Sequence, residues 1–256
     1  MPPRSEPSSS APFTVGSPDS PRRVLIIHGY TGSPDEFREL AHDLAQRLSA
    51  YVSVPLLPGH GTTLADLERT SYKQLIDYGM QKAREMAAAG KPLAIIGHSF
   101  GGYIAALAAE EIKLKALVLA VTPYRLKWPI FIPGMELVMR MRTEWRKKMS
   151  EEEREARKGL FYYPAMPGRA LGYLKRGIRA MRLILPSLKM PILTIHTRND
   201  QLTYSSSGSI MLKKSGGNPE NKSIVLEHRR HGIFYGVGKE EVVRDISDFL
   251  AKVMLR

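Results

Sequence analysis

The sequence predicts an α/β protein in which a mostly parallel sheet is flanked by helices and carries an inserted helical cap. Short apolar runs that are typical of buried strands alternate with segments of helical periodicity from residue 23 to residue 122, and again after residue 189. Such alternation indicates a parallel sheet between two layers of helices. The alternation stops between residues 123 and 188, where we expect a helical cap without strands.

Length and composition limit the possible architectures. A chain of 256 residues can form one α/β domain with an insertion, and the absence of cysteine excludes disulfides, thiol catalysis and thiolate metal sites. No apolar run reaches the roughly 18 residues that a membrane-spanning helix needs. Residues 1–20 are rich in Pro and Ser and lack an apolar core, so we expect a mostly disordered segment and no signal peptide. A cytoplasmic protein is the corresponding expectation.

The positive charge is concentrated in the predicted cap. The chain has a net charge of +13, and residues 123–188 contain 15 Lys and Arg against 6 Glu and no Asp, a net +9. A basic face of this kind is either simply solvated or attracts phosphates, including those of anionic lipid head groups. Because the cap also contains Trp, Met and Phe, it could make peripheral contact with an anionic membrane surface. No nucleic acid is expected as a partner, since no nucleic-acid module or stacking platform is recognisable.

The first strand and helix frame a glycine-containing turn. Arg23–Ile27 is a short apolar strand, and the turn His28–Gly32 follows it directly. Ser33 and Pro34 suit the N-cap and first turn of a helix that we expect to extend to Leu48. A turn at the carboxyl end of a parallel strand is where open α/β sheets bind ligands.

The next elements return the chain to the centre of the sheet. Tyr51–Val54 is predicted as a strand, and the prolines and glycines of residues 55–61 predict a fixed loop. His60 in this loop is interpreted as a structural histidine rather than a base. Ser71–Ala89 is predicted as a helix that ends at Gly90.

The stretch from residue 91 to residue 104 carries the strongest functional signal. Leu93–Ile96 is a buried strand, Gly97-His98-Ser99-Phe100-Gly101 forms a G-x-S-x-G turn, and Tyr103–Ile112 is predicted as a helix. This strand–turn–helix order is that of a nucleophile elbow, in which glycines avoid collisions and the serine is held in a strained conformation. Ser99 is therefore the candidate nucleophile. In hydrolases with such an elbow, two backbone amides stabilise the oxyanion, and here they would belong to Tyr30, which follows Gly29, and to Phe100.

The remaining elements supply the partners that a serine nucleophile needs. We predict a strand at Ala116–Val121, a charged cap helix around Glu151–Lys158 and a further strand at Pro191–Thr197. A helix at Ser205–Lys214, a strand at Lys222–Glu227 and a closing helix at Lys239–Val253 complete the chain.

A serine hydroxyl needs a base to remove its proton, and histidine oriented by a carboxylate is the usual solution. The chain order Ser, acid, His that is typical after such an elbow is met by Ser99, Asp200 and His231, each in a loop after a predicted strand. His228 is the alternative base, and we favour His231 because it lies beside Gly232 in the loop. No histidine pair has metal-ligand spacing, so neither a metal nor another cofactor is expected.

These motifs together resemble those of the bacterial monoacylglycerol lipases and the related small carboxylesterases of the α/β-hydrolase superfamily. The resemblance rests on VLIIHGYTGSPDEF, LLPGHGT, LERTSYKQL, IIGHSFGG, the Asp200 loop and HGIFYGVGKEEVVRDISDFL. It implies an α/β-hydrolase core at residues 21–122 and 189–256, with the cap or lid at 123–188. It also implies Ser99, Asp200 and His231 as catalytic triad, Tyr30 and Phe100 as oxyanion amides, and acyl esters or monoacylglycerols as substrates.

Neighbouring activities are separated by single features of the sequence. Haloalkane dehalogenases and epoxide hydrolases of this fold use Asp where Ser99 stands, and aminopeptidase relatives need an acidic cap. Thioesterase and lysophospholipase activity remain compatible with the same triad. A hydrolase-fold protein that binds a ligand without turnover is the alternative from a different class.

Overall fold

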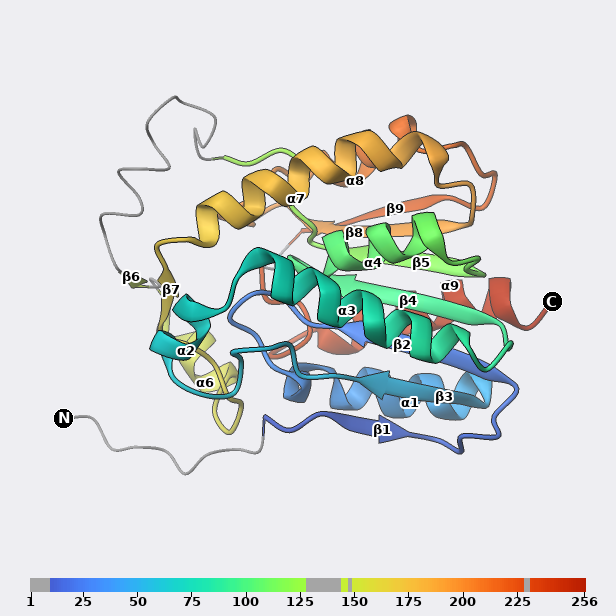
Figure 1. Ribbon diagram of the computed structural model, residues 1–256, viewed down its shortest axis with the longest axis horizontal. Helices are drawn as coiled ribbons and strands as arrows, with labels where there is room; N and C mark the ends of the chain where they lie inside the picture. Colours follow the sequence, from blue (N-terminus) through green and yellow to red (C-terminus); the bar gives the residue numbers. More distant parts are fainter. Residues whose placement is uncertain (1–9, 128–143, 147–148, 228–230) are drawn as a thin grey trace.

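A seven-stranded sheet forms the centre of the molecule. The computed structural model describes residues 10–127, 144–146, 149–227 and 231–256 (Figure 1). The strand order is β1-β3-β2-β4-β5-β8-β9, and all neighbours are parallel except β1, which pairs antiparallel with β3. The strands are β1 (Phe13–Val15), β2 (Arg22–Ile27), β3 (Ala50–Val54), β4 (Leu93–His98), β5 (Ala116–Ala120), β8 (Ile192–Thr197) and β9 (Lys222–Leu226).

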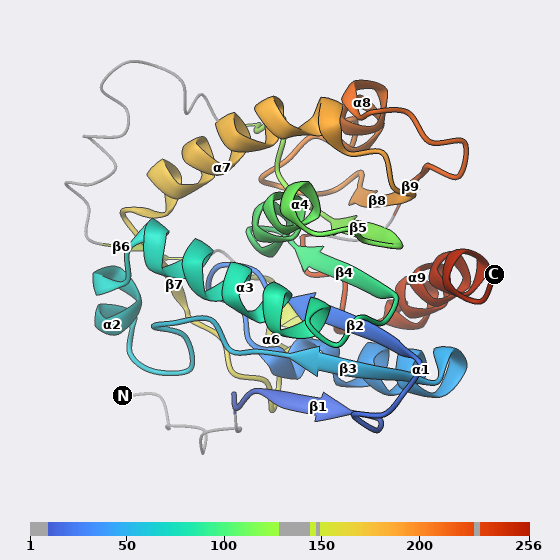
Figure 2. The same cartoon turned by 45° about the vertical axis from the view of Figure 1, so that its right-hand side comes forward.

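Helices cover both faces of the sheet (Figure 2). One face packs against α1 (Arg38–Leu48) and α9 (Lys239–Met254). The other face packs against α3 (Tyr72–Ala87), α4 (Gly101–Glu111), α7 (Ala170–Ile184) and α8 (Ser207–Lys214). The short 3-10 helices η1 (Pro34–Phe37) and η2 (Leu185–Ser187) precede α1 and follow α7.

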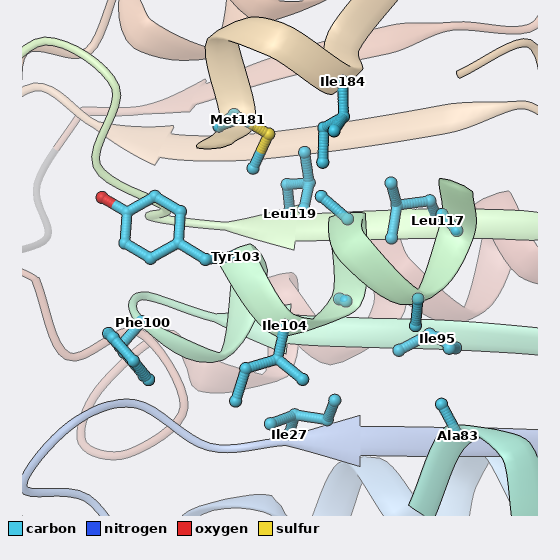
Figure 3. Close-up of a cluster of buried hydrophobic side chains, with 14 of the residues drawn as sticks. Ile27, Ala83, Ile95, Phe100, Tyr103, Ile104, Leu117, Leu119, Met181 and Ile184 are labelled. Carbon is cyan, nitrogen blue, oxygen red and sulfur yellow. The ribbon is translucent and has the colours of Figure 1, made fainter. Parts of the chain in front are cut away.

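The central strands are buried on both faces, which explains why they are continuously apolar rather than alternating. Every residue of β4 and β5 is buried. Helix α4 lies between the sheet and α7, so side chains from three layers meet around it. Figure 3 shows this cluster, in which Tyr103 and Ile104 of α4 lie between strand and α7 side chains: Ile27, Ile95, Leu117, Leu119, Met181 and Ile184.

The carboxyl ends of the parallel strands face the cap elements. Helices α2 (Leu64–Arg69) and α6 (Glu151–Ala156) lie at this end of the sheet (Figure 1). Beside them, β6 (Glu144–Arg146) and β7 (Ala165–Pro167) form an antiparallel pair. The expectation that the cap lacks strands is therefore wrong. Residues 128–143 and 147–148 of the predicted cap lie outside the described residues.

Two further expectations need correction. The segment expected to be disordered up to residue 20 contains β1, whose three residues pair with Val52–Val54 at the sheet edge. The Arg38 guanidinium also lies 4.7 Å from the centre of the Phe13 ring, so a long-range contact holds a segment whose composition suggests disorder. Helix α7 lies within the predicted cap, yet it packs on α4 as part of the core layer.

The other predicted elements are present with shifted ends. The helix expected from Tyr103 begins at Gly101, the last residue of the G-x-S-x-G serine turn. The helix predicted from Ser71 starts at Tyr72, because Ser71 is its N-cap and accepts a hydrogen bond from the Gln74 amide. The short helix α2, which begins with a capping box at Thr63, was not predicted.

Candidate active site

Ser99 occupies the sharp turn between β4 and α4. Its backbone has φ of 51°, a left-handed conformation that is strained for a non-glycine residue, and its amide donates to the Ala120 carbonyl at 2.8 Å. The flanking glycines have steric causes. A Cβ at Gly97 would lie 2.5 Å from the Gly102 Cα, and one at Gly101 would lie 2.2 Å from the Ile27 carbonyl oxygen. The chain can make this turn only because both positions lack a side chain.

Ser99, His231 and Asp200 form a continuous chain of hydrogen bonds. The Nδ1 atom of His231 lies 2.7 Å from Oδ2 of Asp200, and its Nε2 atom lies 2.8 Å from the Ser99 hydroxyl. An ionised carboxylate can only accept, so Nδ1 donates to Asp200 and Nε2 accepts from the serine hydroxyl. The three residues come from the ends of β4, β8 and the loop after β9, as expected from the sequence. The alternative base, His228, lies outside the described residues.

The carboxylate of Asp200 is completely buried and surrounded by donors. Its Oδ1 atom accepts hydrogen bonds from the amides of Leu202 at 2.7 Å and Thr203 at 3.2 Å. Burial alone would raise the pKa of Asp200, but the charge and hydrogen bond of His231 and the two amides together lower it. Asp200 is therefore a fixed negative charge behind the imidazole.

The turn after β2 lies directly against the serine turn. A Cβ at Gly29 would lie 3.1 Å from the Ser99 Cβ, so the backbone of this turn and that of the elbow are in contact. Tyr30 and Phe100 both line the cavity beside Ser99. The N-terminus of α4, which begins directly after Phe100, adds a favourable dipole for negative charge beside Ser99.

A cavity of about 540 Å³ opens above Ser99 and His231. Much of its lining is apolar and comes from the cap and α7: Met149, Met166, Leu171 and Leu174, with Leu202 of the Asp200 loop. Ligand sites typically have volumes of roughly 300–1,000 Å³. The cavity is therefore large enough for an acyl chain and a small alcohol.

Charged residues at one side of the cavity were not predicted from the sequence. The Arg157 guanidinium, at the end of α6, lies 4.3 Å from the Tyr235 ring centre and donates a hydrogen bond to the tyrosine hydroxyl. Burial outweighs the opposing charge of Arg157 and raises the pKa of Tyr235 to about 12. Glu36 and Glu153 also line the cavity. No pattern in the sequence distinguishes Arg157 from the other basic residues of the cap.

The second residue of the serine turn, His98, is a buried neutral group. Burial and, to a smaller extent, the charge of the neighbouring His231 lower its pKa to about 3. Its Nδ1 atom lies 3.8 Å from Glu36 Oε2, and its Nε2 atom lies 3.5 Å from the His231 carbonyl oxygen. His98 therefore supports the loop that carries His231 and is not suited to donate or accept protons near neutral pH.

Neither a metal-binding cluster nor a membrane-spanning helix is present in the part of the chain that the structure describes. Within it, no group of three His, Asp or Glu side chains has the geometry of a metal site. None of its helices is both long and apolar enough to cross a membrane.

Comparison with known proteins agrees with the fold. A profile described as "Alpha/beta hydrolase family" matches residues 24–243. The chain belongs to the alpha/beta hydrolase family. Within this family, the chain is 33% identical over 109 residues to the thermostable monoacylglycerol lipase of Bacillus sp. (strain H-257), a match that covers 41% of this chain and 40% of that protein.

Two longer matches extend over nearly the whole chain. The carboxylesterase of Bacillus subtilis (strain 168) is 23% identical over 245 residues, covering 94% of this chain and 96% of that protein. A structure reported for the metagenome-derived lipolytic enzymes LipS and LipT superposes with a TM-score of 0.81 at 23% identity, covering 95% of this chain and 98% of that one. The structural likeness supports the alpha/beta hydrolase fold that the sequence predicts.

Proposed function

We propose that this protein is a serine hydrolase that cleaves carboxylic esters, most favourably monoacylglycerols or short-to-medium-chain acyl esters, through an acyl-enzyme intermediate. The observation that carries the proposal is the hydrogen-bonded chain of Ser99, His231 and Asp200 at the floor of a largely apolar cavity. The monoacylglycerol lipase and carboxylesterase relatives support this substrate class.

The geometry suits acylation by a general-base mechanism. His231 Nε2 takes the proton of the Ser99 hydroxyl as its oxygen attacks the ester carbonyl carbon. The negative charge that develops on the carbonyl oxygen is stabilised by the amides of Tyr30 and Phe100. As the intermediate collapses, the C–O bond to the alcohol breaks, and His231 returns the proton to the leaving oxygen.

Deacylation repeats these steps with water as nucleophile. His231 takes a proton from the water, the hydroxide adds to the acyl carbon, and the Ser99 oxygen leaves with the proton. Throughout, the buried carboxylate of Asp200 keeps the imidazole in one tautomer and stabilises its cation. No additional cofactor is needed for these steps.

The nucleophile is tested by substitution and labelling. We expect Ser99→Ala to remain folded and to lose at least about 10³-fold in kcat for a p-nitrophenyl ester, because the triad acts as one unit. A fluorophosphonate should label Ser99 alone. A folded Ser99→Ala protein with substantial turnover would contradict the proposal, whereas tight ester binding by an inactive wild type would indicate a ligand-binding protein.

Substrate choice is tested by a panel. Profiling p-nitrophenyl esters and monoacylglycerols of increasing chain length should place the highest kcat/KM at a short or medium chain. Faster cleavage of acyl thioesters or lysophospholipids in the same panel would replace the proposed substrate class while keeping the mechanism.

We also propose peripheral contact with anionic membranes, since the substrates partition to lipid surfaces. Support comes from a groove between α7, η2 and α8, whose basic lining residues are Arg125, Arg182 and Lys214. On α7, Leu183 follows Arg182 in the chain and is 81% exposed, and an exposed apolar side chain next to basic residues is typical of interfacial surfaces. Between residues 169 and 219, the single acidic residue in the sequence is the buried Asp200.

Vesicle binding tests this surface. We expect binding to phosphatidylglycerol vesicles at low ionic strength and release by salt, because each exposed Lys or Arg contributes about 1 kcal/mol near such a surface. Replacing Arg125, Arg182 and Lys214 by Gln should weaken the binding without changing hydrolysis of a soluble ester. Equal binding to neutral and anionic vesicles would contradict this contact.

A further inference from the structure

Two buried histidines cross-link the turn after β2 and the loop after β3. His28 follows β2, and its Nε2 atom accepts the Leu57 amide hydrogen at 3.0 Å. His60 lies in the loop after β3, and its Nε2 atom accepts the Thr31 amide hydrogen at 3.1 Å. Each loop thus contributes one histidine and one amide, and the ring centres are 4.8 Å apart. We call this reciprocal pair, His28 and His60, the histidine clasp.

The other ring nitrogens determine the tautomers. Nδ1 of His60 lies 3.0 Å from the Pro58 carbonyl oxygen, and Nδ1 of His28 lies 2.9 Å from the Gly29 carbonyl oxygen. A carbonyl oxygen can only accept and an amide can only donate, so Nδ1 carries the hydrogen and Nε2 the lone pair in both rings. The clasp therefore consists of two neutral imidazoles, each with both nitrogens engaged.

The residue that His60 holds is in an unfavourable conformation. Thr31 has φ of 69°, which is strained for a β-branched side chain. It directly follows Tyr30, whose amide is the proposed oxyanion donor, and the Gly32 amide closes this turn on the Gly29 carbonyl at 3.0 Å. Strained backbone persists only where its surroundings hold it.

The cap holds the His60 loop from the other side. The hydroxyl of Tyr163, which precedes β7, donates to the Gly59 carbonyl at 2.9 Å and accepts from the Thr62 amide at 3.2 Å. These contacts lie on either side of His60 in the chain. The tyrosine hydroxyl thereby limits the movement of the imidazole that supports Thr31.

We propose that His60 is a positioning residue for the oxyanion hole: its hydrogen bond to the Thr31 amide keeps the Tyr30 amide directed at the reacting carbonyl. The inference rests on the proposed serine hydrolase function. His60 lies in a loop that contributes no proposed triad member, and it acts through the backbone of the turn rather than on the substrate. Its loss should therefore lower transition-state stabilisation more than substrate binding.

The test compares two amides that replace different nitrogens of the ring. In His60→Gln, the side-chain oxygen can reach the place of Nε2 and accept from Thr31, whereas the shorter side chain of His60→Asn reaches only the place of Nδ1. The control is Ser247→Ala, which removes a part-buried hydrogen bond to Asp43 between α9 and α1, on the face of the sheet that these two helices cover. Each variant is assayed for kcat, KM, thermal unfolding and inhibition by a trifluoromethyl ketone, which binds as an oxyanion.

We expect His60→Asn to lose roughly 10- to 100-fold in kcat, less than the 10²–10³-fold for removal of an oxyanion donor itself, with KM within about threefold. Its affinity for the trifluoromethyl ketone should fall in parallel, and His60→Gln should recover most of both losses. Ser247→Ala should lower the unfolding temperature without changing kcat.

Wild-type kcat and ketone affinity in a folded His60→Asn would overturn the inference, as would equal losses in His60→Gln and His60→Asn. If His60→Asn does not fold, Tyr163→Phe provides the milder test, with an expected loss of about threefold to tenfold in kcat at constant KM; an unchanged kcat would overturn the inference. Absence of Ser99-dependent turnover in the wild type would instead refute the proposed function itself.

Discussion

Lowering the pH from 7 to 5 should destabilise this protein through three buried histidines. Burial lowers the pKa of His28 and His196 to about 4 and that of His98 to about 3, from an ordinary value of 6.5. Between pH 6.5 and the folded pKa values, the folded state therefore binds fewer protons on these histidines than the unfolded state does. The stabilisation is fully present above pH 6.5, is lost progressively as the pH falls, and stops changing near pH 3–4, where the folded histidines also protonate.

The magnitude follows from the width of this window. At pH 5 the unfolded histidines are one and a half pH units below their pKa, and each unit corresponds to about 1.36 kcal/mol. Each buried histidine therefore accounts for a loss of about 2 kcal/mol, and the three together for about 6 kcal/mol. This is a large share of the roughly 5–15 kcal/mol by which folded proteins are stable. Carboxylates, which titrate near pH 4 when unfolded, contribute little in this window.

Urea unfolding followed by circular dichroism at pH 7, 6 and 5, at constant ionic strength, measures the effect. The matched variant is His196→Gln, because the amide can still donate to the Thr122 carbonyl that His196 Nε2 contacts at 3.0 Å. It should reduce the loss between pH 7 and 5 by about 2 kcal/mol. A free energy of unfolding that changes by less than about 1 kcal/mol in the wild type, or an identical pH dependence in His196→Gln, would refute the reasoning.

Four substitutions probe the serine turn, its partners and the alternative base. Asp200→Asn should leave the protein folded but lower kcat by about 10⁴-fold, because an amide at this position favours the wrong tautomer of His231. The small remaining activity can be measured from the product that accumulates over a long incubation. Near-normal turnover would contradict the proposed role of Asp200. Gly101→Ala should prevent folding or lower the unfolding temperature strongly, since its Cβ would lie 2.2 Å from the Ile27 carbonyl oxygen; a soluble variant with wild-type unfolding would show that the turn can relax. His231→Ala should be nearly as inactive as a variant without the nucleophile, whereas His228→Ala should lose less than about tenfold in kcat; the reverse order would transfer the role of base to His228.

Elements defined by local signals could be predicted from the sequence. Strand β4 is predicted by an apolar run, and the turn at Ser99 by the G-x-S-x-G pattern between a strand and a helix. The steric cause at Gly97 is local, because a Cβ there would meet Gly102, whereas the one at Gly101 comes from the distant Ile27 carbonyl. The grouping of Ser99, Asp200 and His231 could also be predicted, because each follows a strand and the carboxyl ends of parallel strands meet at one edge of the sheet. Their hydrogen bonds at 2.7 and 2.8 Å agree with that reading.

Features created by long-range contacts could not be predicted. Strand β1 has too few residues to show a pattern and depends on β3 for its hydrogen bonds. The sequence alone could not show whether Arg157 is solvated or lies over Tyr235, because 78 residues separate the two in the chain.

The sequence by itself determined the α/β alternation, the strained serine turn and the candidates for base and acid, since these depend on side-chain periodicity and on glycines next to the turn. Tertiary structure alone decided that α7 joins the core rather than the cap, and that His60 holds Thr31. Both depend on which surfaces meet after folding: α7 packs on α4, and the Thr31 amide finds its acceptor 29 residues away. A periodic pattern records that a side chain is buried, but not which partner buries it.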